Sequence, residues 1–373
     1  MQFIDLKKQY SLIEDNLKGR FDNILKNASF IMGEEVNVLE SKLAEYTGVK
    51  ECIACSSGTD ALLIPLMAYG IGRGDAVFVP AFTFYASAEV IALAGATPVF
   101  VDVREDTFNI DPVKLKTAIR SVLNEGKLKP RAIIPVDLFG LPAEYDMISQ
   151  IAQEFELIVI EDGAQGFGGT FQNQKVCSFG NAAATSFFPA KPLGCYGDGG
   201  AIFTDDENLA DIMKSIRIHG FGKNRYENVR LGINGRLDAL QAAVLIEKLN
   251  IFDDELQSRE RVARKYSEEL NNVISTPVVP ENYTSSWAQY TLIAKDEEQR
   301  DRVMNHLKTK DIPTMIYYLI PLHRQKVFND LKSDYCDLSI SEHLANCVFS
   351  IPMHPYISDY EQSMIIDAIK QSI

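Results

Sequence analysis

The sequence has no long apolar run, no dense set of cysteines and no excess of basic residues. Charged residues interrupt the first 20 positions, and no uninterrupted apolar stretch is long enough to cross a bilayer, so we expect neither a signal peptide nor a membrane span. The 51 acidic residues outnumber the 37 lysines and arginines, which gives a formal charge of −14. This charge argues against nucleic acid or an anionic membrane as the main partner. We therefore expect a cytoplasmic protein.

Six cysteines are scattered over 373 residues, which is too sparse for a disulfide framework. Cys52 and Cys55 have the spacing of a redox or metal-binding pair, but no second such pair and no nearby histidine completes a zinc site. Both are small residues in an apolar segment, so we interpret them as parts of a buried strand. We expect no metal site.

The first two thirds of the chain alternate short apolar runs with helical stretches. The runs are apolar throughout, which indicates strands of a mostly parallel sheet covered on both faces. We expect strands at 76–80, 97–102, 132–137 and 157–162, and helices at 86–93 and 143–155. Three of these strands end in an acid, at Asp102, Asp137 and Asp162. Ligands of such sheets bind beyond the carboxyl ends of the strands, so Asp162 and Phe84, just past strand ends, mark a shared candidate site.

A different pattern begins at Arg236, where apolar residues recur at helical spacing and charge then increases. It predicts one long helix, or two in tandem, leading out of the first domain. The length of the chain and its 46% hydrophobic content suit two domains. We expect a large α/β domain over residues 1–248, with an N-terminal arm at 1–12, and a smaller α+β domain over 249–373. The smaller domain is expected to contain a strand at 288–294 and helices at 296–310 and 359–371.

Lys191 lies in a glycine-rich segment downstream of the acidic strand end at Asp162. A lysine amine can form a Schiff base with the aldehyde of pyridoxal 5′-phosphate (PLP), and then serve as base and acid for proton transfer. A carboxylate can keep the pyridine nitrogen of PLP protonated. At ~3 Å and an effective dielectric of about 20, that attraction is on the order of 5 kcal/mol before desolvation. Taken alone, Lys191 could equally belong to a surface turn, and Asp162 could cap a helix.

Gly58 and Thr59 follow a short apolar segment and precede a helical pattern. The unpaired N–H groups and the positive dipole end of a helix N-terminus bind phosphate, and glycine permits close approach of the backbone. Ser186, five residues before Lys191, could reach the same phosphate. Taken alone, the segment is also consistent with an ordinary helix start that Thr59 or Asp60 caps.

Two further side chains complete the predicted cofactor site. Gln165, three residues after Asp162, could hydrogen-bond the 3-hydroxyl of PLP, and Phe84 could stack on its ring, although Phe84 also suits a hydrophobic core. An anionic substrate would need a local basic patch in so acidic a chain. The best candidate is a cluster that could equally be a solvated loop: His219, Lys223, Arg225 and Arg230.

With these residues assembled, the chain resembles the DegT/StrS family of sugar aminotransferases, which are fold-type I PLP enzymes acting on nucleotide-linked keto sugars. The matching motifs include Ser57-Gly-Thr-Asp-Ala, Glu161-Asp-Gly-Ala-Gln165, Ser186-Phe-Phe-Pro-Ala-Lys191, Gly197-Asp-Gly-Gly and Gly232-Ile-Asn-Gly-Arg-Leu-Asp. The resemblance implies a homodimer with shared active sites, in which Asn234 of the partner subunit binds phosphate and Arg236 lines the same edge. Relatives that dehydrate the sugar carry histidine at the position of Lys191, so the lysine favours transamination.

Within the family, the chain is especially similar to 3-oxo-sugar aminotransferases of surface-polysaccharide assembly, through the segments 192–198 and 350–356. Members specific for glucuronate have histidine followed by tyrosine where this chain has Tyr317 and Tyr318. If that histidine helps to hold the uronate carboxylate, its replacement weakens the case for an acidic sugar, and a 6-deoxy-3-keto hexose on dTDP becomes a competitor. We expect His219, Arg236, Tyr317 and Tyr318 to contact the substrate.

The sequence thus predicts PLP-dependent transamination of a UDP- or dTDP-linked keto sugar. Glutamate is the amino donor that the family resemblance implies. Three alternatives stay open: a 4-keto-sugar aminotransferase, a PLP-dependent sugar dehydratase, and a PLP-binding regulator without catalysis.

Overall fold

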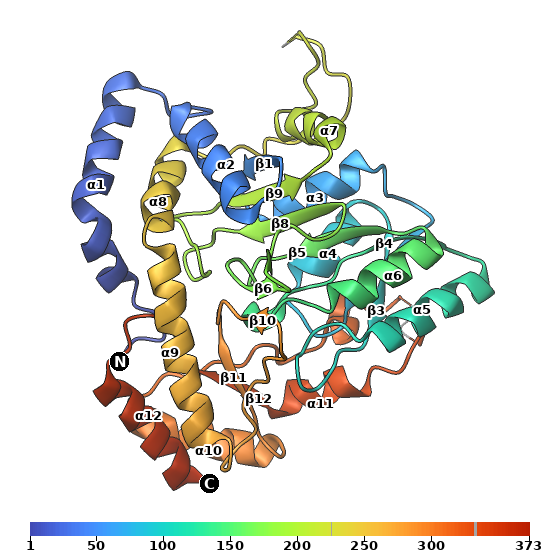
Figure 1. Ribbon diagram of the computed structural model, residues 1–373. Coiled ribbons are helices and arrows are strands. Elements are labelled where there is room, and N and C mark those ends of the chain that lie inside the picture. The colour runs from blue at the N-terminus through green and yellow to red at the C-terminus, as the bar shows by residue number, and fades with distance from the viewer. Residues whose placement is uncertain (225, 332–333) are drawn as a thin grey trace.

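A seven-stranded sheet forms the centre of the computed structural model, which describes residues 1–373 except 225 and 332–333 (Figure 1). Its strands lie in the order β1-β9-β8-β5-β4-β2-β3. Strand β9 is antiparallel to both of its neighbours, and the other four neighbouring pairs are parallel. The predicted α/β fold with a mostly parallel sheet is confirmed. The strands are β1 (Glu51–Cys55), β2 (Asp75–Pro80), β3 (Thr97–Val101), β4 (Lys129–Ile133), β5 (Ile158–Asp162), β8 (Ala182–Ser186) and β9 (Gly200–Thr204).

Helices cover both faces of this sheet because its strands are apolar on both sides. In β1, Cys52 and Ala54 pack on one face while Ile53 and Cys55 pack on the other, as the alternation of strand side chains requires. Helices α3 (Gly58–Ala68), α4 (Ala86–Leu93) and α7 (Glu207–Arg217) cover the second face. The first face is covered by α1 (Leu6–Asn27), α2 (Glu34–Thr47), α5 (Pro112–Glu125), α6 (Tyr145–Phe155) and α8 (Ala239–Leu249).

Two predicted boundaries are wrong for identifiable reasons. The strand expected at 132–137 ends at Ile133, because Pro135 has no N–H group with which to continue the ladder. The arm expected at 1–12 is shorter, because α1 begins at Leu6, where the Asp5 carboxylate accepts a hydrogen bond from the backbone N–H of Lys8 at 2.9 Å. Helix α4, in contrast, has the predicted bounds.

The tandem arrangement predicted from residue 236 onward is present: α8 ends at Leu249 and α9 (Phe252–Leu270) follows. In the C-terminal region β11 (Tyr290–Ile293) pairs with β12 (Val348–Ile351), and these strands share an apolar core with α9, α10 (Glu297–Thr309) and α12 (Asp359–Ser372). Strand β10 (Tyr283–Thr284) pairs instead with β6 (Thr170–Phe171), which also pairs with β7 (Gln174–Lys175). The division into two domains stays a prediction. No helix in the described part of the chain is long and apolar enough to cross a membrane.

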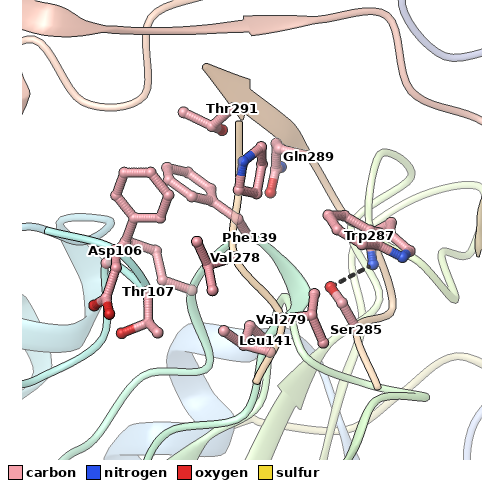
Figure 2. A pocket seen from close by; sticks show the side chains of 13 residues that line it. Asp106, Thr107, Phe139, Leu141, Val278, Val279, Ser285, Trp287, Gln289 and Thr291 are labelled. Carbon is pink, nitrogen blue, oxygen red and sulfur yellow. Dashed lines mark hydrogen bonds between the residues drawn. The ribbon is translucent and has the colours of Figure 1, made fainter. Parts of the chain in front are cut away.

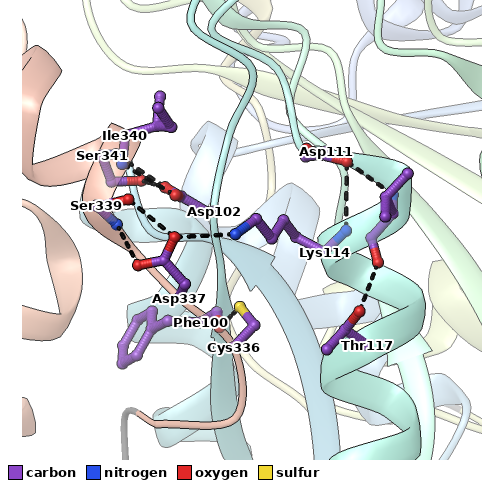
Figure 3. Close-up of polar contacts among 11 residues, drawn as sticks. Phe100, Asp102, Asp111, Lys114, Thr117, Cys336, Asp337, Ser339, Ile340 and Ser341 are labelled. Carbon is purple, nitrogen blue, oxygen red and sulfur yellow. Dashed lines mark hydrogen bonds and ion pairs between the residues drawn. The ribbon is translucent and has the colours of Figure 1, made fainter.

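Besides the pairing of β10 with β6, the C-terminal region contacts the central sheet at Asp102, directly after β3 (Figure 3). The buried Asp102 carboxylate accepts hydrogen bonds from the N–H groups of Ile340 and Ser341, at 3.0 and 2.8 Å, and from the Ser341 hydroxyl. These residues open α11 (Ser339–Cys347). The first N–H groups of a helix lack partners within it, so this carboxylate serves as their cap. Nearby, Lys114 of α5 forms an ion pair with Asp337 at 2.9 Å.

Candidate active site

A cavity of about 450 Å³ opens where β5 and β8 end and α3 begins. Parallel strands of such sheets place their ligands at this edge. The cavity is lined by residues from strand ends, a helix start and the segment before the 3₁₀ turn at Leu322–Arg324. Nine of the predicted site residues are among them: Gly58, Thr59, Phe84, Asp162, Gln165, Ser186, Lys191, Tyr317 and Tyr318.

Asp162 is the last residue of β5, and 5% of it is exposed. The hydroxyl of Ser87 donates to Asp162 Oδ2 at 2.7 Å, and the N–H of Ala164 donates to Oδ1 at 3.2 Å. Burial raises the pKa of Asp162, whereas the Ser87 hydrogen bond and the charge of Lys191 oppose that rise. The two donors fix the orientation of the carboxylate at the wall of the cavity.

Lys191 lies in the turn after β8, where its N–H donates to the carbonyl of Phe188 at 2.8 Å. Burial lowers the pKa of its amine, and the charge of Asp162 acts in the opposite direction. A lysine with a lowered pKa is neutral more often, and is therefore a better nucleophile and base. Gly194 permits this turn, since a Cβ there would lie 2.6 Å from the carbonyl oxygen of Phe188.

The start of α3 has the geometry of a phosphate site. Ser57 is its N-cap and accepts from the N–H of Asp60 at 3.0 Å, so the alternative that Thr59 or Asp60 caps the helix is wrong. A Cβ on Gly58 would lie 2.5 Å from Cβ of Ser186. The glycine therefore lets the end of β8 approach the helix N-terminus, and both line one cavity.

Gln165 is held on both sides of its amide. Its Oε1 accepts from the N–H of Phe139 at 2.8 Å, and its Nε2 donates to the hydroxyl of Tyr318 at 3.0 Å. One amide hydrogen is left for a ligand. The ring of Phe84 is 53% exposed at the cavity and lies 6.3 Å from the Tyr318 ring, so the structure excludes the core interpretation of Phe84.

Three predicted site residues do not line this cavity. His219 and Asn234 are exposed, and Asn234 forms a backbone bridge with Ile218. Arg236 is half-buried, and no acceptor among the described residues reaches its Nε. Their expected roles, including that of Asn234 of the partner subunit, stay predictions. Arg225 of the predicted basic cluster lies outside the described residues.

Several residues to which the sequence analysis assigned no role contribute to the site. Ser87, in the first turn of α4, donates a hydrogen bond to Asp162. In the sequence, its place one helical turn after Phe84 is what could have indicated that it lies at the site. Gln289 reaches the cavity from the segment before β11. Gln289 also lines a small neighbouring crevice, together with Trp287 and Phe139 (Figure 2). It therefore belongs to the wall that separates the crevice from the cavity. The other additional lining residues include Ser57, Thr83, Phe188, Asp198 and Gly199.

The sequence profile of the DegT/DnrJ/EryC1/StrS aminotransferase family matches residues 11–370. The chain belongs to this family. This aminotransferase is 43% identical over 370 residues, 99% of both chains, to a UDP-2-acetamido-2-deoxy-3-oxo-D-glucuronate aminotransferase of Pseudomonas aeruginosa. It is 37% identical over 370 residues, 99% of this chain and 98% of the other, to a dTDP-3-amino-3,6-dideoxy-alpha-D-galactopyranose transaminase of Aneurinibacillus thermoaerophilus.

Among solved structures, a family aminotransferase from Brucella abortus superposes with a TM-score of 0.97 at 49% identity, covering 100% of this chain and 99% of the other. Structures of other relatives contain pyridoxal or pyridoxamine phosphate. The cofactor of this aminotransferase is PLP. The residues present fit it, because a lysine and an aspartate face one cavity, and the same cavity is lined by the start of α3 together with Ser186.

Proposed function

We propose that this aminotransferase transfers an amino group to the 3-keto carbon of a nucleotide-diphosphate-linked sugar, with glutamate as donor, in surface-polysaccharide or amino-sugar biosynthesis. The observation that carries the proposal is the placement of Lys191 and Asp162 on one cavity, close enough for the charge of each to shift the pKa of the other. The names of both relatives support a 3-amino or 3-oxo sugar on UDP or dTDP.

Bound PLP supplies an electron sink for the carbanion that amino transfer generates. Asp162, oriented by Ser87, would hold the proton on the pyridine nitrogen. Gln165 would donate its remaining amide hydrogen to the 3-hydroxyl, while Thr59, Ser186 and the N–H groups at the start of α3 would hold the phosphate. Lys191 Nζ would take the proton from the donor's α-carbon and deliver it to the former aldehyde carbon of the cofactor; its lowered pKa favours the neutral amine that takes the proton.

The sugar subsite favours a neutral sugar over a uronate. Tyr317 and Tyr318, both uncharged phenols, occupy the wall where the glucuronate-specific members of the family are expected to carry a histidine. Within the described lining of the cavity, Lys191 is the only basic side chain. A substrate carboxylate would therefore need Arg236 or another cation from a partner subunit, which we expect in a homodimer. A 6-deoxy-3-keto sugar on dTDP needs no such cation.

The half-reaction with glutamate tests the reaction type. We expect glutamate to remove the visible absorption band of the lysine-bound cofactor in the PLP-loaded protein. A 3-keto sugar on dTDP or UDP should then restore the band. Lys191→Ala should fold but give no turnover, because it lacks both the covalent link and the base. A band that glutamate leaves unchanged, or turnover by Lys191→Ala, would contradict the proposal.

The choice of sugar is tested by comparing a neutral dTDP-linked 3-keto sugar with a UDP-linked 3-keto uronate on the same pyridoxamine form. We expect faster recovery of the band with the neutral sugar. Tyr317→His should shift this preference toward the uronate. Preference for the uronate by the unchanged protein would assign it to the substrate class of the Pseudomonas aeruginosa relative.

A further inference from the structure

Two carboxyl groups that the proposed chemistry does not use lie directly behind Asp162. Asp137 follows β4, and Glu161 precedes Asp162 in β5. Both residues have 0% exposure, and their carboxyl groups are close enough for each to shift the pKa of the other. Two ionised carboxylates in contact and out of water would be strongly unfavourable. The contact between them therefore calls for a proton.

The donors around this pair leave one oxygen without a partner. Asp137 Oδ1 accepts from the N–H of Ala143 at 2.9 Å and from the hydroxyl of Tyr145 at 2.8 Å. The Glu161 oxygens accept from the N–H groups of Cys177 and Phe179, at 2.5 and 2.8 Å. Asp137 Oδ2 is buried, and no N–H or O–H of the described residues reaches it. A proton carried by Glu161 would supply the missing donor.

The pair is joined to the active site through the backbone. The N–H of Asp137 donates to the carbonyl of Asp162 at 3.1 Å, and the N–H of Asp162 donates to the carbonyl of Pro135 at 2.9 Å. On the other side, a Cβ on Gly166 would lie 2.5 Å from Cβ of Asp137 and 3.0 Å from its Oδ2. Asp137 thus packs against the turn that carries Gln165.

We propose that Glu161 and Asp137 share a single proton, and that this one-proton carboxyl pair is a positioning unit for Asp162 and Gln165. The inference rests on the proposed role of Asp162 as the partner of the pyridine nitrogen. With its proton, the pair carries one negative charge and every oxygen has a donor. Without it, a second buried charge would appear next to Asp162 and disfavour the ionised Asp162 carboxylate.

The titration of the pair agrees with this placement of the proton. Burial raises the pKa of both carboxyl groups, and the hydrogen bonding between them raises the pKa of Glu161 further while it lowers that of Asp137. Glu161 is therefore the protonated member. The other titratable groups that act on the pair are Asp162 in β5, Tyr145 in α6, Cys177 after β7 and Tyr283 in β10.

A folded state that binds this proton makes stability depend on pH with a defined sign. The unfolded carboxyl groups lose their protons at about their ordinary pKa values of 3.8 and 4.5, whereas burial raises the pKa of both groups in the folded state, so the folded pair keeps a proton to higher pH. Between these values the native state holds the extra proton, so this contribution lowers stability as pH rises. For one proton, the unfolding equilibrium constant increases by about tenfold per pH unit.

Asp137→Asn removes the need for the proton while it conserves charge. The asparagine Oδ1 keeps both of its donors, and Nδ2 can donate to an ionised Glu161, so the pair again carries one negative charge. We would measure urea unfolding of the PLP-loaded protein and of this variant, at one protein concentration, from about pH 5 to 7. The unfolding constant of the unchanged protein is expected to rise more steeply, by about tenfold per pH unit. Parallel curves would overturn the proposal.

Infrared spectroscopy gives a test that needs no variant. At pH 6 ordinary carboxyl groups are ionised, so a carbonyl stretch of a buried protonated carboxyl should stand alone and disappear as the pH is raised. Absence of this carbonyl stretch would overturn the shared proton even if Asp137→Asn fails to fold.

The positioning role is tested with the visible absorption band of bound PLP. This band should be lost at lower pH in the unchanged protein than in Asp137→Asn. A proton found without that difference would overturn the positioning role and leave the proposed reaction intact.

Discussion

Asp102 and Asp162 occupy equivalent positions in the sequence pattern, each where an apolar strand of the central sheet ends, yet the fold uses them differently. Asp102 accepts three hydrogen bonds from the start of α11. It is not among the described residues that line the active-site cavity. Asp162 accepts one short bond from Ser87 and a longer one from Ala164, and it faces the cavity with Lys191. The number of donors that arrive from elsewhere in the chain decides whether a strand-end acid stabilises the fold or is available to a ligand.

Among variants that keep Lys191, Asp162→Asn should produce the largest effect on activity. Asparagine keeps the size of the side chain and can still accept from Ser87, but it cannot hold a proton on the pyridine nitrogen by charge. Removing one preorganised electrostatic contact of this kind costs about 10²–10³ in kcat. We expect a fall of at least this size with little change in Tm, measured by steady-state kinetics with a keto sugar and by thermal unfolding. Activity within tenfold of the unchanged enzyme would contradict the assignment of Asp162.

Asp102→Ala should reverse that pattern, with a large effect on stability. It leaves the N–H groups of Ile340 and Ser341 without their acceptor, and hydrogen bonds to a charged group contribute about 1.5–3 kcal/mol each. We expect a loss of about 3 kcal/mol or more in the free energy of unfolding, measured by urea titration at fixed protein concentration.

Lys114→Met is the matched control for this experiment, because it removes only the ion pair with Asp337 at the same junction. That pair is partly exposed and should contribute little. If Lys114→Met destabilises the protein as much as Asp102→Ala does, the capping of α11 is not what Asp102 contributes.

The parts of this arrangement that the sequence predicts are those set by neighbours along the chain. Apolar runs locate the strands, and the run 86–93 becomes α4 with the same bounds. The acid at each strand end is equally visible, but its use is not. Asp102 meets Ser341, 239 residues along the chain, and nothing near either residue in the sequence indicates that contact. Gln289 likewise reaches the cavity only because the segment before β11 returns to the sheet.

Ser87→Ala tests the comparison most finely, because it removes the short hydrogen bond of Asp162 and leaves the carboxylate in place. The Ser87 hydroxyl lowers the pKa of Asp162, so its loss should raise that pKa further. The reaction needs the ionised carboxylate, and the activity lost on acidification should therefore be lost at a higher pH in the variant. Because a hydrogen bond to a charged group contributes about 1.5 kcal/mol, we expect kcat/KM to fall by about tenfold, measured across the acid limb of the pH profile.

Ser121→Ala in α5 is the control. It removes an exposed hydroxyl bonded to the carbonyl of Thr117 and should leave the profile unchanged. If the acid limb of the pH profile does not move in Ser87→Ala, the backbone N–H of Ala164 is enough to orient Asp162. Asp162 would then resemble Asp102, which accepts two of its hydrogen bonds from backbone N–H groups.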